Sequence, residues 1–222
     1  LKWLKKRFPN AQINYKYANM VGKAKNLEPT QIPNGIRIWT YDGFDAQKYG
    51  IRLYKSHSYF ISNVKPLKKP EYDVFYVGRD KGRGDWLIEL EKKMQSLGIK
   101  TKFIITADGT LSSKKPYYQN PIEYSEVTDY LTKSRSVLNV VMEDQQGITV
   151  RDTEAIFFGI KLLTTNKHIK DWDMYHRDNV FFINSDMDIS GLVDFLNRPV
   201  NPVDKRLLQK HTIAGMIDEI TG

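Results

Sequence analysis

The sequence predicts an α/β protein built around a doubly wound parallel sheet, and two observations support this fold class. From about residue 71 to residue 200, strand-like and helix-like segments alternate with short connections, the pattern of strands joined by crossover helices. The strand-like segments are short and apolar, as expected of parallel strands that helices cover on both faces. We therefore predict a sheet domain over residues 67–200, preceded by the remnant of a second α/β domain over 1–66 and followed by a C-terminal helix over 201–222.

The first domain is expected to contain two strands and two short helices. Residues 1–8 predict the end of a basic helix that Pro9 terminates, and strands are expected over 11–17 and 36–42. A short helix should follow over 44–50, with Asp45 as its N-cap and Gly50 as its end. The segment 64–72, which carries two prolines, is interpreted as the linker between the domains.

The second domain is predicted from a regular series of segments. Strands are expected at 73–78, 101–106, 136–142, 161–165 and 179–184, and helices at 85–98, near 124–134, around Glu154 up to Gly159, near 188–196 and over 204–220. In the helix over 85–98, leucines and a methionine fall on one face. Asp85 is expected to cap the start of that helix and Gly98 its end.

The composition is that of an ordinary globular chain. Of 222 residues, 41% are hydrophobic and 12% aromatic, which is enough to bury a substantial core. No apolar run approaches the roughly 18 residues of a membrane helix, and no signal segment opens the sequence. The absence of cysteine excludes disulfides and thiolate metal ligands and fits a reducing cytoplasm. Because the sequence begins at Leu1 without a methionine, we expect it to be a fragment.

The net positive charge of the chain comes entirely from its first third. Residues 1–70 hold 14 Lys and Arg against 3 Asp and Glu, whereas the remaining residues hold 20 against 23, giving the net charge of +8. Such a block attracts anionic partners, or it is simply a solvated basic surface. Because no RNA-binding aromatic motif, zinc finger or helix-turn-helix signature accompanies the charge, nucleic acid is not expected as a partner. Anionic lipid head groups or phosphorylated substrates fit better.

Ligands of open parallel sheets bind beyond the carboxyl ends of the strands, and the first candidate loop there is Gly78–Gly84. Its glycines let the backbone approach a ligand, and Arg79, Lys81 and Arg83 supply positive charge suited to a diphosphate. The loop lacks the Gly-Lys-Ser/Thr of a Walker A motif and the glycine spacing of the dinucleotide fingerprint. The alternative interpretation is an exposed basic turn.

The second candidate loop, Glu143–Asp152, leads into the helix that carries Glu154. A helix N-terminus presents free N–H groups and a positive dipole end, which suit phosphate. Gly147 permits a close approach, the N–H groups from Ile148 onward should face the end of the sheet, and the Glu154 carboxylate could accept hydrogen bonds from sugar hydroxyls. This stretch predicts a nucleotide-type ligand. The alternative is that Glu154 is a surface helix residue.

Other candidate motifs are weaker. Asp171-Trp172-Asp173 and Asp186-Met187-Asp188 have the Asp-any-Asp pattern that can bind Mg²⁺ or Mn²⁺. Neither follows a strand directly inside a single-domain nucleotide site, and acids are common in loops, so no metal site is predicted. The four histidines, His57, His168, His176 and His211, show no metal spacing and no nucleophile pattern. If His176 and Arg177 take part in function, we expect them to line the cleft that binds the nucleotide-type ligand.

These residues resemble the second half and domain junction of a bacterial GT-B glycosyltransferase of lipopolysaccharide, capsule or exopolysaccharide biosynthesis. Gly78-Arg79 and Lys81-Gly82 resemble the Gly-Arg and Lys-Gly pairs that follow the first strand of the Rossmann-like C-terminal domain in such enzymes. Glu154-Ala155, followed by Gly159 and a strand, resembles the end of a signature of Glu, seven residues, then Glu-Ala. The resemblance covers about residues 71–200.

The resemblance implies a metal-independent glycosyltransferase that needs no cofactor and takes a nucleotide-diphosphate-sugar as donor substrate. Arg79 and Lys81 would contact the diphosphate and Glu154 the ribose. The same binding site is expected to include Gly78, Gly82, Arg83, Gln146, Gly147, Ile148 and Arg151. Gln146 stands where the signature has its first Glu, and the nearest acids are Glu143 and Asp144. Inversion or retention of the anomeric centre is therefore not predicted.

The predicted function is sugar transfer to a lipid-linked or polysaccharide acceptor in cell-surface polysaccharide biosynthesis. No general base is assigned, because Asp45 is better explained as a helix cap and Asp42 as a turn residue. A nucleotide-sugar epimerase of the same fold and a non-catalytic partner subunit remain as alternatives. The expected location is cytoplasmic, with the basic segment 1–70 in peripheral contact with anionic lipid on the inner face of the cell membrane.

Overall fold

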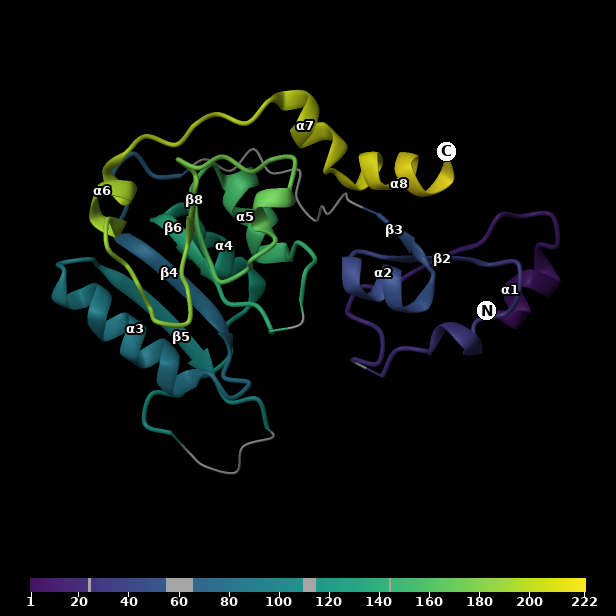
Figure 1. The fold of residues 1–222 in the computed structure, drawn as a ribbon, viewed down its shortest axis with the longest axis horizontal. Coiled ribbons are helices and arrows are strands. Elements are labelled where there is room, and N and C mark those ends of the chain that lie inside the picture. The colour runs from purple at the N-terminus through teal and green to yellow at the C-terminus, as the bar shows by residue number, and fades with distance from the viewer. Residues whose placement is uncertain (24, 55–65, 110–114, 144) are drawn as a thin grey trace.

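The computed structural model describes residues 1–23, 25–54, 66–109, 115–143 and 145–222. These residues form two parallel β-sheets, each with helices packed against it (Figure 1). His57, the first two residues of the expected linker at 64–72, and Asp144 lie outside the described residues. Leu67 and Glu71 of that linker donate backbone hydrogen bonds to Thr132 and Lys133. The later part of the linker therefore belongs structurally to the larger sheet, while the domain boundary at residues 66 and 67 stays a prediction.

The larger sheet has five parallel strands in the order β5-β4-β6-β7-β8. They are β4 (Tyr72–Arg79), β5 (Thr101–Thr106), β6 (Ser134–Asn139), β7 (Lys161–Thr164) and β8 (Val180–Phe182). All five were expected from their short apolar segments, although β6 ends three residues earlier than predicted and β8 is shorter. The direction in which successive strands are added to the sheet reverses after β5, because β5 lies on one side of β4 and β6 on the other.

Helices cover both faces of this sheet, which confirms the doubly wound α/β fold class. On one face α3 (Gly84–Ser96) and α6 (Leu192–Asn197) contribute Leu87, Leu90 and Phe195 to a buried core. On the other face α4 (Tyr124–Thr132) and α5 (Val150–Phe158) contribute Leu131 and Phe158 to a second core. A short 3-10 helix, η2 (Ile169–Asp171), packs at the edge of the second core.

The smaller sheet belongs to the N-terminal part. Its three parallel strands are β1 (Asn14–Lys16), β2 (Arg37–Thr40) and β3 (Arg52–Leu53), in that order. Its helices are α1 (Lys2–Arg7), the 3-10 helix η1 (Pro29–Gln31) and α2 (Gly43–Tyr49). The expected α1, β1, β2 and α2 are confirmed, whereas β3 and η1 were missed because two or three residues carry no periodicity.

Glycine ends three helices as predicted, but two of the predicted N-caps are wrong. Gly50 and Gly159 terminate α2 and α5 in the left-handed conformation, with φ of 62° and 64°. The N-cap of α2 is Asp42 rather than Asp45, and the first residue of α3 is Gly84, one before the expected cap Asp85. The Gly84 N–H is satisfied by the side chain of Asp80. Both errors arise because a preceding carboxylate reaches the helix N-terminus first.

The C-terminal segment, expected as one helix over 204–220, forms two: α7 (Lys205–Lys210) and α8 (Ile213–Thr221). Thr212 starts α8 by accepting the Gly215 N–H, and buried His211 holds the break through a 2.7 Å contact between Nε2 and Asp173 Oδ1. α8 lies beside the N-terminal sheet (Figure 1), where Lys16 Nζ contacts Met216 Sδ at 3.2 Å. Among the described residues, none of the helices has the length and apolarity needed to cross a bilayer.

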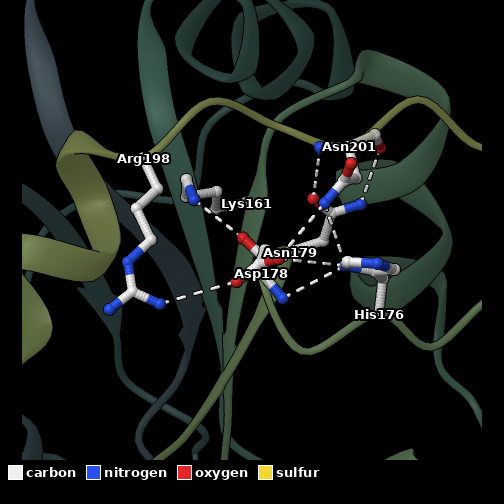
Figure 2. A network of polar contacts seen from close by, with 6 residues as sticks. All are labelled: Lys161, His176, Asp178, Asn179, Arg198 and Asn201. Carbon is white, nitrogen blue, oxygen red and sulfur yellow. Dashed lines mark hydrogen bonds and ion pairs between the residues drawn. The ribbon is translucent and has the colours of Figure 1, made fainter.

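A polar network ties the chain beyond α6 to the loop that enters β8 (Figure 2). Buried Lys161 donates to the Asp178 carbonyl at 2.8 Å, and Asn179 and Asn201 exchange two hydrogen bonds of 2.8 and 2.7 Å. His176 contacts Asn201 through Nδ1 at 3.1 Å. Because this loop enters β8, it lies at the amino end of the sheet. The expectation that His176 and Arg177 line a ligand cleft is therefore wrong, and the network is structural.

Candidate functional site

The candidate site lies where the strand order of the larger sheet reverses. The loop after β4 (Asp80–Arg83) and the loop after β6 (Val140–Thr149) leave adjacent parallel strands in opposite directions. In open parallel sheets such a switch point forms a crevice at the carboxyl ends of the strands, and ligands bind there. Both loops were identified from sequence. The structure makes the first loop shorter than predicted, because Gly78 and Arg79 belong to β4 and Gly84 to α3.

A cleft of about 950 Å³ opens at this switch point, between the two sheets. Its larger-domain wall includes Arg79 at the end of β4, the first-loop residues Lys81, Gly82 and Arg83, the second-loop residues Ile148 and Thr149, and Val150 and Arg151 at the start of α5. Its opposite wall comes from the N-terminal part, through Ala18, Asn19, Met20, Lys23, Tyr41 and Tyr54. The volume is at the upper end of the roughly 300 to 1,000 Å³ typical of small-molecule sites. Six of the ten predicted site residues line it: Arg79, Lys81, Gly82, Arg83, Ile148 and Arg151.

The charge of the described lining residues is strongly positive. Five cations, Lys23, Arg79, Lys81, Arg83 and Arg151, face the cleft with one carboxylate, Asp108. Partial burial and the neighbouring Arg83 and Arg79 lower the pKa of Lys81, and Asp108 only partly offsets them. Lys81 holds its backbone at φ 50°, in the left-handed region, followed by Gly82 at φ 81°. Like charges crowded in this way are stabilised by a bound anion.

Arg83 is fixed at the base of this group of cations. Its Nη1 donates to the Val140 carbonyl at 2.5 Å, so it joins the two loops. Its Nε and the hydroxyl of Tyr76 are both buried, and the interaction of Tyr76 with Arg83 lowers the pKa of Tyr76, although the larger effect of burial raises it.

Asp80 holds the first loop in place, and sequence reasoning missed it. Its carboxylate is buried, accepts the Gly84 N–H at 2.7 Å and accepts the Tyr118 hydroxyl at 2.6 Å. Burial raises the pKa of this carboxyl, but the hydrogen bonds from Tyr118, Gly84 and Tyr117 outweigh it and hold the pKa below its usual value. The start of α3 is thus occupied by a protein carboxylate, which leaves the cations of the loop to face the cleft.

The start of α5 is also capped from within the protein. Thr149 Oγ1 accepts the Arg151 N–H at 3.2 Å, and Asp152 accepts the Thr149 N–H at 2.7 Å, forming a capping box. Asn139, the last residue of β6, donates to both Thr149 and Asp152. Burial raises the pKa of Asp152 above its usual value. Thr149, Val150 and Arg151 still line the cleft, so the positive end of α5 points toward it.

Glu154 is fully buried, and both of its carboxylate oxygens have partners. Oε1 accepts the Tyr124 hydroxyl at 2.8 Å, and Oε2 pairs with Arg151. Burial raises the pKa of Glu154, although Arg151 and Tyr124 counteract it. Glu154 is absent from the described lining of the cleft, whereas its partner Arg151 lines it. The surface-residue alternative is therefore wrong, and the role of Glu154 as a ribose ligand stays a prediction.

Gln146 and Gly147 are engaged by the N-terminal part instead of facing the cleft. Both donate backbone N–H groups to Asp42 Oδ2, at 2.9 and 2.8 Å. The other oxygen of Asp42 caps α2 by accepting the N–H groups of Phe44 and Asp45. A Cβ placed on Gly147 would lie 2.5 Å from the Tyr41 ring. Asp42 is thus a buried contact between the two parts, and the interpretation of it as a turn residue was incomplete.

The remaining candidates are placed away from the cleft. Gly78 lies inside β4, packed over the Tyr76 hydroxyl. Asp173 is paired with Lys210 and His211, which lower its pKa against the effect of burial, and Asp188 accepts two hydrogen bonds from Ser190. Across the part of the chain that the structure describes, no three His, Asp or Glu side chains gather in a way that could hold a metal ion.

Comparison with known proteins gives one kind of match. No protein-family model matches the sequence, and no curated protein matches it. Among solved structures, the chain is similar to the crystal structure of a DNA-modifying β-glucosyltransferase, studied with and without its substrate uridine diphosphoglucose. The two share 15% sequence identity at a TM-score of 0.49, over 94% of this chain and 70% of the other. A likeness at this level carries no conclusion about the activity of this chain.

Proposed function

We propose that this protein is a glycosyltransferase that binds a nucleotide-diphosphate-sugar in the cleft between its two sheets and transfers the sugar to a lipid-linked or polysaccharide acceptor. The observation that carries this proposal is the group of cations at the switch point. Arg79, Lys81, Arg83 and Arg151 line one cleft with the start of α5. A diphosphate needs several cationic donors within a few ångströms, and a neutral sugar or peptide needs none.

The same cations suit the chemistry of sugar transfer. When the bond between the anomeric carbon and the diphosphate breaks, the nucleoside diphosphate leaves with the electron pair and gains negative charge. Fixed cations and a helix N-terminus directed at that charge stabilise the transition state more than the ground state. Arg83 is held by its bond to Val140, and the capping box fixes the start of α5. Both are therefore oriented before a ligand arrives.

The role that we propose for Glu154 requires Arg151 to change partners. Arg151 lines the cleft and pairs with Glu154 in the structure. A diphosphate in the cleft would compete for Arg151 and release Oε2 of Glu154, which could then accept a ribose hydroxyl. Arg151 and Glu154 would thus respond to the donor together.

The proposed setting is cell-surface polysaccharide synthesis at the inner face of the cell membrane. The basic residues of 1–70 support this, together with the exposed side chains of α1 and its flank: Trp3 is 67% and Phe8 50% exposed, beside Lys5, Lys6 and Arg7. Aromatic and basic side chains together favour an anionic lipid interface, where each Lys or Arg contributes about 1 kcal/mol. Release from anionic vesicles on raising ionic strength would test this part.

A nucleotide titration tests the donor site. Uridine, guanosine, cytidine and thymidine nucleotides and their sugar conjugates would be titrated by calorimetry and by thermal shift, since a ligand specific for the folded state raises its stability. We expect one nucleotide to bind, and Arg79→Ala/Lys81→Ala to weaken it at least about tenfold, or 1.4 kcal/mol. The control is Lys92→Ala, an exposed lysine on α3 outside the cleft. If no nucleotide binds, or if the control weakens binding equally, the proposal fails.

An activity assay then separates transfer from its alternatives. Nucleotide release that depends on an added acceptor supports transfer. Release without an acceptor indicates hydrolysis, and an isomerised sugar that stays attached to its nucleotide indicates an epimerase. Donor binding with none of these activities would identify a non-catalytic subunit.

A further inference from the structure

Tyr76 lies in β4, and its ring belongs to the core on the α3 face of the larger sheet. The residue is 2% exposed, and its ring packs against Phe103 with the two ring centroids 5.5 Å apart. A phenylalanine would fill this place without burying a hydroxyl. Because a buried hydroxyl costs stability unless a partner offsets the cost, the hydroxyl of Tyr76 points to a role beyond packing.

Gly78 makes room for this hydroxyl. It follows Tyr76 by two residues in β4, so both lie on the same face of the strand. A Cβ on Gly78 would lie 2.7 Å from the Tyr76 hydroxyl and 3.1 Å from the ring carbon that carries it. The φ of Gly78 is outside the left-handed region, so its backbone conformation is open to any residue. Glycine is therefore required at this position by the space that the hydroxyl occupies.

The Tyr76 hydroxyl interacts with the cations of the cleft. Burial raises the pKa of Tyr76, whereas the nearby guanidinium groups of Arg83 and Arg151 lower it. The Nε of Arg83 is buried as well, and its Nη1 donates to the Val140 carbonyl at 2.5 Å. The planar guanidinium of Arg83 is thus held from two sides, by Val140 in the loop after β6 and by Tyr76 in β4.

We propose that Tyr76 is a positioning residue, whose hydroxyl fixes the orientation of the Arg83 guanidinium for binding a diphosphate in the cleft. Arg83 lines this cleft together with Arg79 and Lys81. A guanidinium donates two parallel hydrogen bonds to phosphate oxygens only when its plane is correctly oriented. A group that is already held in that orientation also loses less freedom when the anion binds. This inference rests on the proposed function, because it assumes that the cleft holds a diphosphate.

A double-mutant cycle tests whether Tyr76 acts through Arg83. The variants are Tyr76→Phe, Arg83→Ala and the two together, and the probe is inorganic pyrophosphate, which needs no nucleoside. The control is Tyr17→Phe. Tyr17 is 1% exposed, its hydroxyl donates to the Leu27 carbonyl at 2.5 Å, and it does not line the cleft. Calorimetry gives each Kd, and urea unfolding verifies that each variant is folded.

We expect Tyr76→Phe to weaken pyrophosphate binding about fivefold and the control to change it less than about twofold. In the Arg83→Ala background, Tyr76→Phe should change the Kd less than about twofold, because a positioning residue has no effect once its partner is absent. The inference is overturned if pyrophosphate does not bind, if Tyr76→Phe leaves its Kd unchanged, if the control loses as much affinity, or if the loss is the same without Arg83.

Gly78 separates positioning from folding. Gly78→Ala places a methyl group against the Tyr76 hydroxyl, so we expect it to lower stability through overpacking. Adding Tyr76→Phe removes the clash and should restore stability but not pyrophosphate affinity. A double variant that binds as tightly as the unsubstituted protein would contradict the inference. If the cycle behaves as expected but no nucleotide binds, the role of Tyr76 stands and the glycosyltransferase proposal fails.

Discussion

The two loops at the switch point follow neighbouring strands, but they are used differently. In the loop after β4, Asp80 accepts a hydrogen bond from Gly84 at the start of α3, while Lys81 and the preceding residue Arg79 line the cleft. The loop after β6 is held by the N-terminal part, because the backbone N–H groups of Gln146 and Gly147 donate to Asp42. The cations of the first loop therefore line the cleft, whereas backbone N–H groups of the second loop form hydrogen bonds that join the two parts. Two loops with similar sequence signals can therefore have different roles.

This difference predicts that substitutions in the second loop and its partner act mainly on stability, whereas substitutions of cations in the first act on ligand binding. The largest effect is expected for Asp42→Ala. It leaves the half-buried N–H group of Gln146 and the buried N–H group of Gly147 unsatisfied and removes the α2 cap, at a cost of about 3 to 5 kcal/mol. Urea unfolding measures this. Asp218→Ala, which removes an exposed carboxylate on α8, is the control, and equal losses of stability in the two variants would contradict the role of Asp42 in joining the two parts.

Glycine substitutions sharpen the comparison. Gly147→Ala places a methyl group 2.5 Å from the Tyr41 ring, so we expect a loss of about 1 to 3 kcal/mol from overpacking. A methyl group at Gly82 meets no atom within 4 Å, and the cost arises only from its φ of 81°, about 1 kcal/mol. Unfolding curves for both variants test the order. A larger loss at Gly82 would show that the second loop is not closely packed against the N-terminal part.

Asp80→Asn tests how the first loop is held. Because the pKa of Asp80 is below its usual 3.8, its charged form stabilises the fold above about pH 4, and this stabilisation is lost as the pH falls through the lowered pKa. We expect Asp80→Asn to cost about 1 to 2 kcal/mol at pH 7, and the gap to the unsubstituted protein to narrow below pH 4. Urea midpoints measured from pH 7 to pH 3 provide the test, and a gap that does not change with pH would contradict it.

The smallest effect on stability is expected for Glu154→Gln. The amide can still accept the Tyr124 hydroxyl, and burial already disfavours the Glu154 charge and raises its pKa, so we expect a change below about 1 kcal/mol. If Glu154 contacts the ribose, the Kd of the nucleotide should rise about fivefold, equivalent to roughly one hydrogen bond. Urea unfolding measures the change in stability, and calorimetry on the folded variant measures the nucleotide Kd. An unchanged Kd would exclude Glu154 as a ribose ligand.

Local signals in the sequence were sufficient for most of the fold. The apolar segment TKFIIT is typical of a buried strand, and the spacing of Leu87, Leu90 and Met94 is typical of one helix face. Gly50, Gly98 and Gly159 end helices because only glycine adopts positive φ without strain. The sequence also located the two loops at the switch point, since they follow apolar strands. What it missed is short, like β3, or depends on a distant partner, like the caps that Asp42 and Asp80 provide.

The sequence by itself determined the α/β class, the order of the elements and the concentration of cations at Arg79–Arg83, because periodicity, turn chemistry and charge are properties of neighbouring residues. The tertiary structure alone decided which of these groups line the cleft. Asp42 and Gly147 are 105 residues apart in the chain, yet one hydrogen bond joins them. Likewise, only the folded structure shows that Glu154 is buried and bonded to Tyr124 and Arg151. Such pairings depend on where the folded chain brings distant residues together, which no local pattern encodes.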